Sequence, residues 1–199
     1  MKTLPYIAIL CFLLTSFSCS QQKNSQPVQE DYLAQERDTI VGNFSGSQID
    51  TLICEPLDSI SDPTYQGFHY RWKVFAKNHS VEDIIIDNTI RIKFVKEGDL
   101  DGDGADEWGY KTVWETSTWM KYNVYTYKNG KAHYLIEPST IWDIHLDPEN
   151  NCRVFISQED IVSKYTPDSV KLKFSDVRNE GDDFLLIDTI VPIKSFNHN

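Results

Sequence analysis

The chain has few of the residues on which common active sites and metal centres depend. Its 199 residues include four cysteines, and none belongs to a CxxC pair of the kind typical of zinc and redox sites. The five histidines are scattered, without HExxH spacing, and the chain contains no GxSxG segment. We therefore expect no zinc site and no catalytic residues, and we predict that the protein is not an enzyme.

Positive charge is also scarce. The 19 lysines and arginines are outnumbered by 30 aspartates and glutamates, which gives a formal net charge of −11. Binding to nucleic acid requires clustered basic side chains that neutralise phosphates, so the composition argues against a nucleic-acid partner. An acidic surface suits solubility and the binding of cations.

Helical periodicity is almost absent, and apolar residues instead recur at every second position. Alternation of this kind is typical of half-buried strands. It predicts strands at 68–75, 90–95, 108–113, 141–146, 153–157, 170–174 and 184–191. Only 158–164 suggests a short helix, and no βαβ rhythm occurs. We expect a mainly β fold of antiparallel sheets, arranged as blade-like units or a sandwich, with one short helix.

One hairpin can be placed by its turn. Asn129 and Gly130 form the pair that favours a type I′ turn, and tyrosine-rich and apolar runs flank it. The resulting register places Tyr125 opposite Tyr134 and Val124 opposite Leu135.

The N-terminal residues are predicted to lie outside the folded domain. Lys2 precedes an apolar run at 7–14 that is too short to span a bilayer, so 1–18 has the pattern of a signal peptide. Residues 19–38 are rich in glutamine, serine and asparagine, a composition typical of an unstructured tether. An N-terminal helix at 31–37 is the alternative. The β domain is then expected at 39–199.

Cys19 follows Ser18 at the end of this pattern, and the arrangement resembles the lipobox of bacterial lipoproteins. Ser16 stands where leucine is usual, as in the looser lipoboxes of Bacteroidetes-type envelope proteins. The resemblance implies lipidation of Cys19, a membrane partner through that anchor, and an outer-membrane location on the periplasmic or surface face. Ordinary cleaved secretion and an uncleaved anchor remain alternatives.

Two cysteines, Cys54 and Cys152, remain in the expected mature domain. In an oxidising envelope they could form one disulfide. Two buried free thiols are the alternative.

The densest group of oxygen ligands lies between two predicted strands, at 99–107. Carboxylates at every second position of a glycine-containing loop suit Ca²⁺, which takes six to eight oxygens. The predicted ligands are the side chains of Asp99, Asp101, Asp103 and Glu107 and the carbonyl of Ala105. An EF-hand is improbable because its twelfth position is Tyr110 and a predicted strand precedes the loop. A solvated acidic turn without metal is the alternative.

The spacing of these residues resembles the calcium loops of FG-GAP and VCBS-type repeats. In those repeats, acidic or amide residues occupy positions one, three, five and nine of a glycine-rich turn, which implies a structural calcium ion here. Asp106 is then expected to bond backbone amides. Residues 42–52 align on 98–108 without gaps, and Gly42 and Gly46 match Gly98 and Gly102. Asn43, Ser45 and Ser47 replace the aspartates. This copy is expected to form a similar loop without metal, unless the similarity arose by chance.

Aromatic residues are concentrated between 108 and 134, where eight occur: Trp108, Tyr110, Trp114, Trp119, Tyr122, Tyr125, Tyr127 and Tyr134. They could fill the core, which is the simpler account, or form a face for a glycan or protein partner. The combined features favour a non-enzymatic, calcium-stabilised binding or adaptor domain of the cell envelope. The alternatives are an enzyme or enzyme inhibitor whose active residues lie in loops, and a subunit that completes a larger assembly.

Overall fold

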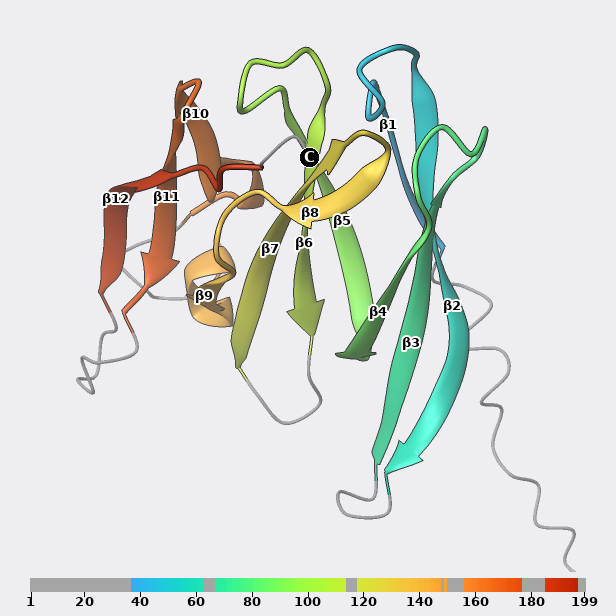
Figure 1. Cartoon of the computed structure of the whole chain (residues 1–199). Helices are drawn as coiled ribbons and strands as arrows, with labels where there is room; N and C mark the ends of the chain where they lie inside the picture. The colour runs from blue at the N-terminus through green and yellow to red at the C-terminus, as the bar shows by residue number, and fades with distance from the viewer. Residues whose placement is uncertain are drawn as a thin grey trace, which may run out of the picture.

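The computed structural model describes residues 37–62, 67–113, 118–147, 149, 156–176 and 185–196. The fold is mainly β, as predicted, and consists of three antiparallel sheets. The sheets stand side by side in chain order, with the N-terminal sheet and the C-terminal sheet on either side of the middle one (Figure 1).

The first sheet is a four-stranded meander in the order β1-β2-β3-β4. Its strands are β1 (Asp38–Gly42), β2 (Asp50–Asp62), β3 (Gly67–Ala76) and β4 (Ile84–Thr89). The middle sheet begins directly afterwards and lies beside β1. The Asp38 carboxylate of β1 accepts a hydrogen bond from the backbone N–H of Phe94, at 2.7 Å, and joins the two sheets.

The middle sheet repeats the meander as β5-β6-β7-β8, and β9 pairs with β7 beside β8. Its strands are β5 (Arg91–Gly98), β6 (Glu107–Val113), β7 (Trp119–Lys128), β8 (Lys131–Tyr134) and β9 (Ser139–Trp142). β8 pairs with the C-terminal part of β7 and β9 with its N-terminal part. Together they form one edge strand that is interrupted at 135–138, where Pro138 lacks the N–H that a ladder requires.

The third sheet has three strands in the order β10-β11-β12. They are β10 (Val162–Thr166), β11 (Ser169–Ser175) and β12 (Leu186–Pro192). Two single 3₁₀ turns, η1 (Asp143–Leu146) and η2 (Gln158–Asp160), precede this sheet.

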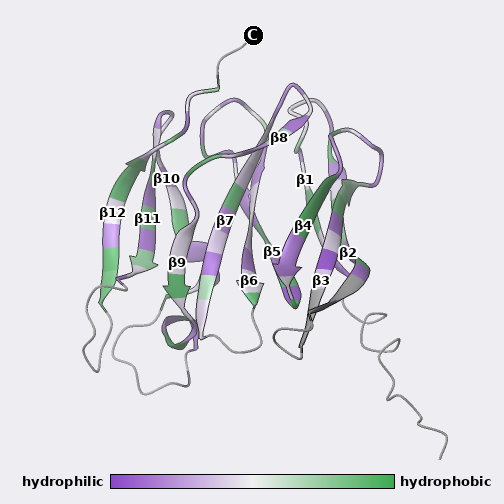
Figure 2. Ribbon diagram, turned by 60° about the horizontal axis from the view of Figure 1, so that its bottom comes forward, coloured by the Kyte–Doolittle hydropathy of each residue, from purple (hydrophilic) through white to green (hydrophobic). Residues whose placement is uncertain are grey.

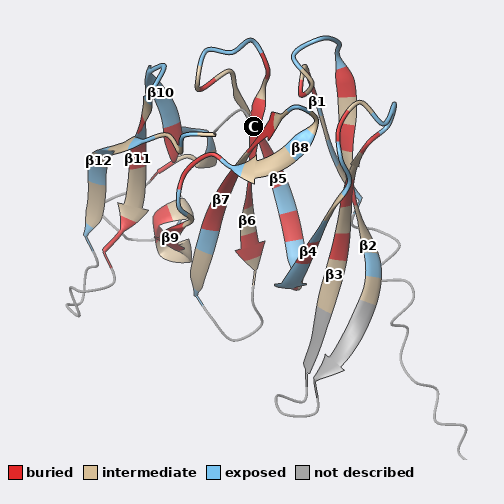
Figure 3. Cartoon of the chain, viewed as in Figure 1, coloured by how far each residue is buried: buried red, intermediate tan, exposed pale blue. Residues whose placement is uncertain are grey.

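The middle sheet is buried on both faces. Trp108 and Phe94 project into a core shared with the first sheet, whereas Tyr122, Val124 and Val95 project into a core shared with the third. The central strand β6 is accordingly the most uniformly buried element of the sheet (Figure 3). Strands at the sides alternate between apolar and polar residues, because one of their faces meets solvent (Figure 2).

Most of the strands expected from sequence alternation are present, and so is the hairpin. β7 and β8 pair with Tyr125 opposite Tyr134, and the N–H of Leu135 donates to the carbonyl of Val124 at 2.9 Å. Both contacts confirm the predicted register.

Two element predictions are wrong. The expected helix at 158–164 is the short turn η2 followed by β10, because Val162 pairs with Leu172 of β11. The expected strand at 141–146 covers only the end of β9, and the turn η1 takes its second half.

Several predicted features lie outside the described residues. These are the signal peptide at 1–18, the lipidation site Cys19, nearly all of the tether, Trp114, Cys152 and most of the strand expected at 153–157. Cys54 is a free thiol, fully buried in the core between the first two sheets, and burial raises the pKa of this thiol. Within the described residues, no helix has the length and apolar character needed to cross a membrane.

Candidate metal site

The acidic loop lies where the three sheets meet at one end of the molecule. In each sheet the first and second strands are joined at this end, through residues 43–49, 99–106 and 167–168 (Figure 1). The middle connection is the acidic one. It contacts Asn43 on one side, and Lys164, at the end of the third sheet, on the other.

Three of the five predicted ligands are brought together. One carboxylate oxygen each of Asp99, Asp101 and Glu107 lies within 4.8 Å of the others. Asp99 and Asp101 are half-buried and Glu107 is fully buried. Three convergent carboxylates are a donor set of the hard oxygen type that Ca²⁺ prefers, with backbone carbonyls and water completing the coordination in such sites.

Glu107 is fixed by two hydrogen bonds at the start of β6. Its carboxylate accepts from the N–H of Leu100 at 2.6 Å and from the hydroxyl of Thr126 at 2.8 Å. Burial, together with the nearby charge of Asp101, raises the pKa of Glu107 to about 7. A cation at this position would favour the ionised carboxylate and offset the cost of burying it.

The backbone of the loop is wrapped around Asp99. The Asp99 carboxylate accepts hydrogen bonds from the N–H groups of Gly102, at 2.5 Å, and Gly104, at 3.2 Å. Both glycines have positive φ, +83° and +89°, a conformation that residues with a Cβ rarely adopt. The glycines therefore allow the tight wrap that the sequence predicted.

Lys128 neutralises part of the loop. Its ammonium group donates to the carboxylates of both Asp101 and Asp103 and is largely buried, with 14% of the side chain exposed. Burial alone would lower the pKa of Lys128, but the two hydrogen bonds raise it above its usual value, so the side chain is a cation. A metal bound to Asp101 would compete with this ammonium group.

Asp103 has another role in the structure. The Asp103 carboxylate lies outside the group of three and binds Lys128 instead. Ala105 is buried, and its N–H donates to Asp103 at 2.8 Å.

The loop at 43–49 packs directly on the acidic loop. The N–H of Asn43 donates to the Asp106 carboxylate at 2.6 Å, and the carbonyl of Asn43 accepts from the N–H of Asp106 at 2.9 Å. The Asn43 amide side chain donates to the carbonyl of Gly104 at 2.9 Å. The expectation that Asp106 bonds a backbone amide is therefore confirmed.

The aligned residue of the first loop, Asp50, has a similar role. It is buried and accepts hydrogen bonds from the Ser80 hydroxyl at 2.7 Å and from the N–H of Asn78 at 3.2 Å. Asp50 is the first residue of β2, and Asp106 directly precedes β6, so both lie where a loop enters the second strand of its sheet. Each carboxylate also hydrogen-bonds its loop to a neighbouring segment that connects two strands. The aligned loops thus share a position and a structural role, although the first lacks the acidic ligands.

Sequence analysis missed the lysines of this site. Lys128 is 25 residues from Asp103, and Lys164, whose ammonium group donates to the Asp99 carbonyl at 2.9 Å, is 65 residues from Asp99. A useful signal was available for Lys128, because it directly precedes the Asn129-Gly130 turn. That turn reverses the chain at the same end of the middle sheet as the acidic loop.

A second, half-buried carboxylate, Glu97, also escaped sequence analysis. The Tyr122 hydroxyl donates to it across Gly109, and burial raises the pKa of Glu97 to about 8. A Cβ at Gly109 would lie 2.6 Å from the Tyr122 oxygen and 2.7 Å from the Glu97 oxygen. The glycine therefore makes room for this hydrogen bond.

The fold also pairs a histidine with a serine. The Nδ1 of His145 and the hydroxyl of Ser175 are 2.8 Å apart, and that hydroxyl accepts from the N–H of Trp142 at 2.9 Å. His145 is 0% and Ser175 1% exposed. A pair so deeply buried offers no surface to a substrate, and its contacts account for it as a link between β9, η1 and β11.

The aromatic cluster is largely core. Trp108, Tyr110, Tyr122 and Tyr127 are buried, and the Trp108 and Tyr125 rings stack with centroids 4.9 Å apart. Tyr134 is the most exposed of those described, at 38%. The simpler account, in which these residues fill the interior, holds for the buried four.

Comparison with known proteins adds no identification. No family model, curated protein or solved structure matches this chain. The class that the fold defines is an all-β protein of three antiparallel sheets.

Proposed function

We propose that the protein is a non-enzymatic binding or adaptor domain of the cell envelope, held together by Ca²⁺ at the acidic loop. The main observation in support of a calcium site is that one carboxylate oxygen each of Asp99, Asp101 and Glu107 lies within 4.8 Å of the others. Its position supports a structural ion, because the loop contacts both outer sheets through Asn43 and Lys164. An ion there would strengthen the junction of the three sheets.

The calcium site is tested by thermal unfolding of the chain in EDTA, in Ca²⁺ and in Mg²⁺. A ligand that binds only the folded state raises stability by RT ln(1 + [L]/Kd), so Ca²⁺ is expected to raise the midpoint. Asp99→Asn should abolish this rise, while its one remaining side-chain oxygen can still accept one of the two backbone hydrogen bonds. Asp83→Asn is the matched control, because Asp83 pairs with Lys73 and with no residue of the acidic loop, so the change should leave the calcium response unaltered. If Ca²⁺ does not change the unfolding midpoint of the wild-type protein, the proposed site is contradicted.

The envelope location is supported by the sequence pattern that ends at Cys19. The expected result is incorporation of labelled palmitate in a bacterial host and recovery of the protein with membranes. Cys19→Ala should remove both, whereas Cys11→Ala should remove neither. Labelling that survives Cys19→Ala would contradict the proposed anchor.

A further inference from the structure

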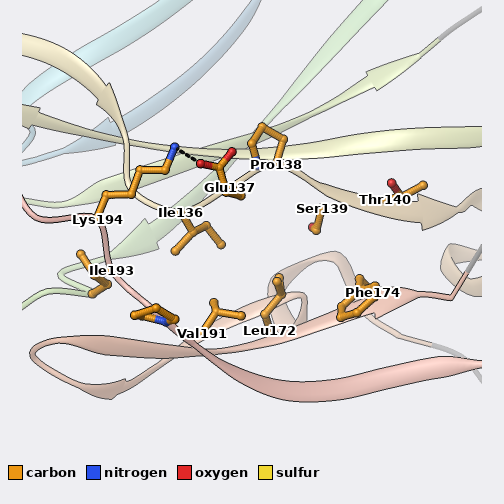
Figure 4. A pocket seen from close by; sticks show the side chains of 11 residues that line it. Ile136, Glu137, Pro138, Ser139, Thr140, Leu172, Phe174, Val191, Ile193 and Lys194 are labelled. Atoms are coloured by element: carbon orange, nitrogen blue, oxygen red, sulfur yellow. Dashed lines mark ion pairs between the residues drawn. The ribbon is translucent and has the colours of Figure 1, made fainter.

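A cavity separates the middle and third sheets where the edge of the middle sheet is interrupted. It has a volume of about 520 Å³, within the range of small-molecule sites. One wall is formed by 136–138, between β8 and β9, and by the first two residues of β9. The opposite wall is formed by β11, β12 and the two residues that follow (Figure 4). The acidic loop contributes no residue to it.

Most of the cavity surface is apolar. Ile136 and Leu172 are almost fully buried, and Phe174, Val191 and Ile193 are partly buried. These side chains would contact the body of an apolar ligand, and their removal from water would supply most of the binding free energy.

One polar group in the cavity wall has no partner. Ser139 is 8% exposed, and its hydroxyl makes no hydrogen bond to any described residue. An unpaired buried hydroxyl costs stability, whereas a ligand oxygen placed against it would remove that cost. This group thus points to a ligand with a polar atom along an otherwise apolar body.

One end of the cavity carries a charge pair. The Lys194 ammonium group lies 2.7 Å from the Glu137 carboxylate and 5.6 Å from the centre of the Tyr134 ring. The Glu137 side chain is 83% exposed and that of Lys194 36%. Glu137 can therefore turn into water at little cost, while Lys194 stays against the ring, and a ligand carboxylate can take the position that Glu137 leaves.

From these features we infer that the cavity binds a medium-chain monocarboxylate with an oxygen on its chain, such as a hydroxylated fatty acid. The carboxylate pairs with Lys194, the chain oxygen faces Ser139, and the chain lies between Ile136 and Leu172. This site is separate from the acidic loop, so binding is expected in EDTA as well as in Ca²⁺. The inference and the calcium proposal can therefore fail independently.

Isothermal titration of the full chain with decanoate and with a mid-chain hydroxydecanoate tests the site. Both compounds should bind, and the hydroxylated one more tightly. Lys194→Met is expected to weaken both by about tenfold, because a charge-assisted hydrogen bond is lost. Lys171→Met is its control, since Lys171 lies on the same sheet over Tyr165 and outside the cavity.

Two tryptophan variants show whether the ligand occupies this cavity, and they separate that effect from an effect on folding. Val191→Trp should fill the cavity and abolish binding, whereas Ile190→Trp adds the same ring at an exposed position of the same strand and should leave binding intact. Ser139→Ala should remove the preference for the hydroxylated compound. The inference is overturned by absence of binding to wild type, by binding that survives Val191→Trp, by an affinity that Lys194→Met leaves unchanged, or by a preference that survives Ser139→Ala.

Discussion

At the scale of single residues, Lys128 decides how the acidic loop behaves without metal. Its ammonium group is shared by Asp101 and Asp103, so it reduces the repulsion among carboxylates that would otherwise strain the loop. The Lys128 ammonium group is thus bound to Asp101, a carboxylate that a calcium ion would also use.

Lys128→Met is therefore expected to destabilise the protein more in EDTA than in Ca²⁺. In EDTA the free energy of unfolding should fall by about 1–3 kcal/mol, because two charge-assisted hydrogen bonds are lost and the carboxylates repel each other. In Ca²⁺ the loss should be smaller and the calcium-induced rise larger than in wild type. Thermal or urea unfolding in both buffers measures the difference.

Lys73→Met is the control for that variant. It breaks a pair with Asp83 at the surface, worth about 0–1 kcal/mol, and should not alter the calcium response. A Lys128→Met protein with the wild-type calcium response would rule out competition between the lysine and the ion.

Gly109 provides a second test at this scale. An added Cβ would meet the Tyr122 oxygen at 2.6 Å, so Gly109→Ala should lower the free energy of unfolding by about 1–3 kcal/mol, as overpacking in cores does. Tyr122→Phe removes the nearer of the two oxygens that this Cβ would meet, so the double variant should lose less stability than the sum of the losses in Gly109→Ala and Tyr122→Phe. If the two losses simply add, the clash lies elsewhere.

At the scale of loops and strands, Asp50 ties the first connection of the first sheet to the connection after β3. Burial tends to raise its pKa, but hydrogen bonds from Ser80, Thr51 and Asn78 prevail and hold the pKa below its usual value. A lowered pKa means that the carboxylate stabilises the fold above the pKa of the unfolded state, near 3.8. This contribution is lost as the pH falls through the lower folded value.

Asp50→Asn should therefore lower stability near neutral pH by about 1–3 kcal/mol, because an amide accepts fewer of these hydrogen bonds. The deficit relative to wild type should shrink in acid, at and below pH 3.8. Urea midpoints measured from pH 7 downward provide the comparison. A deficit that is constant with pH would assign the effect to packing instead of charge.

The sequence predicted local structure well because the determining contacts are local. Alternation at 68–75 and the Asn129-Gly130 turn specify strands and a hairpin through residues a few positions apart, and the acidic loop contains its own carboxylates. Lys128 and Lys164 could not be assigned to that loop, because sheet pairing brings them there from 25 and 65 residues away. The helix expected at 158–164 failed for a related reason, since pairing of Val162 with Leu172 outweighs the local preference of Gln158, Glu159 and Asp160.

At the scale of the whole molecule, the middle sheet contributes to both cores, so the three sheets should unfold together. Leu52 is fully buried in one core and Ile141 almost fully buried in the other. Leu52→Ala is expected to cost about 2–5 kcal/mol and Ile141→Val about 0.5–1.5 kcal/mol. In each variant the transitions followed by tryptophan fluorescence and by far-ultraviolet circular dichroism should coincide. Separate transitions would show that an outer sheet unfolds on its own.

The interruption between β8 and β9 also bears on self-association. A long regular edge strand is a template onto which a strand of another molecule can add, and proline or charge at the edge prevents this. Pro138 removes one donor, and the exposed Glu137 places a charge beside it. The break that opens the cavity therefore also keeps this edge of the middle sheet from acting as a seed for aggregation.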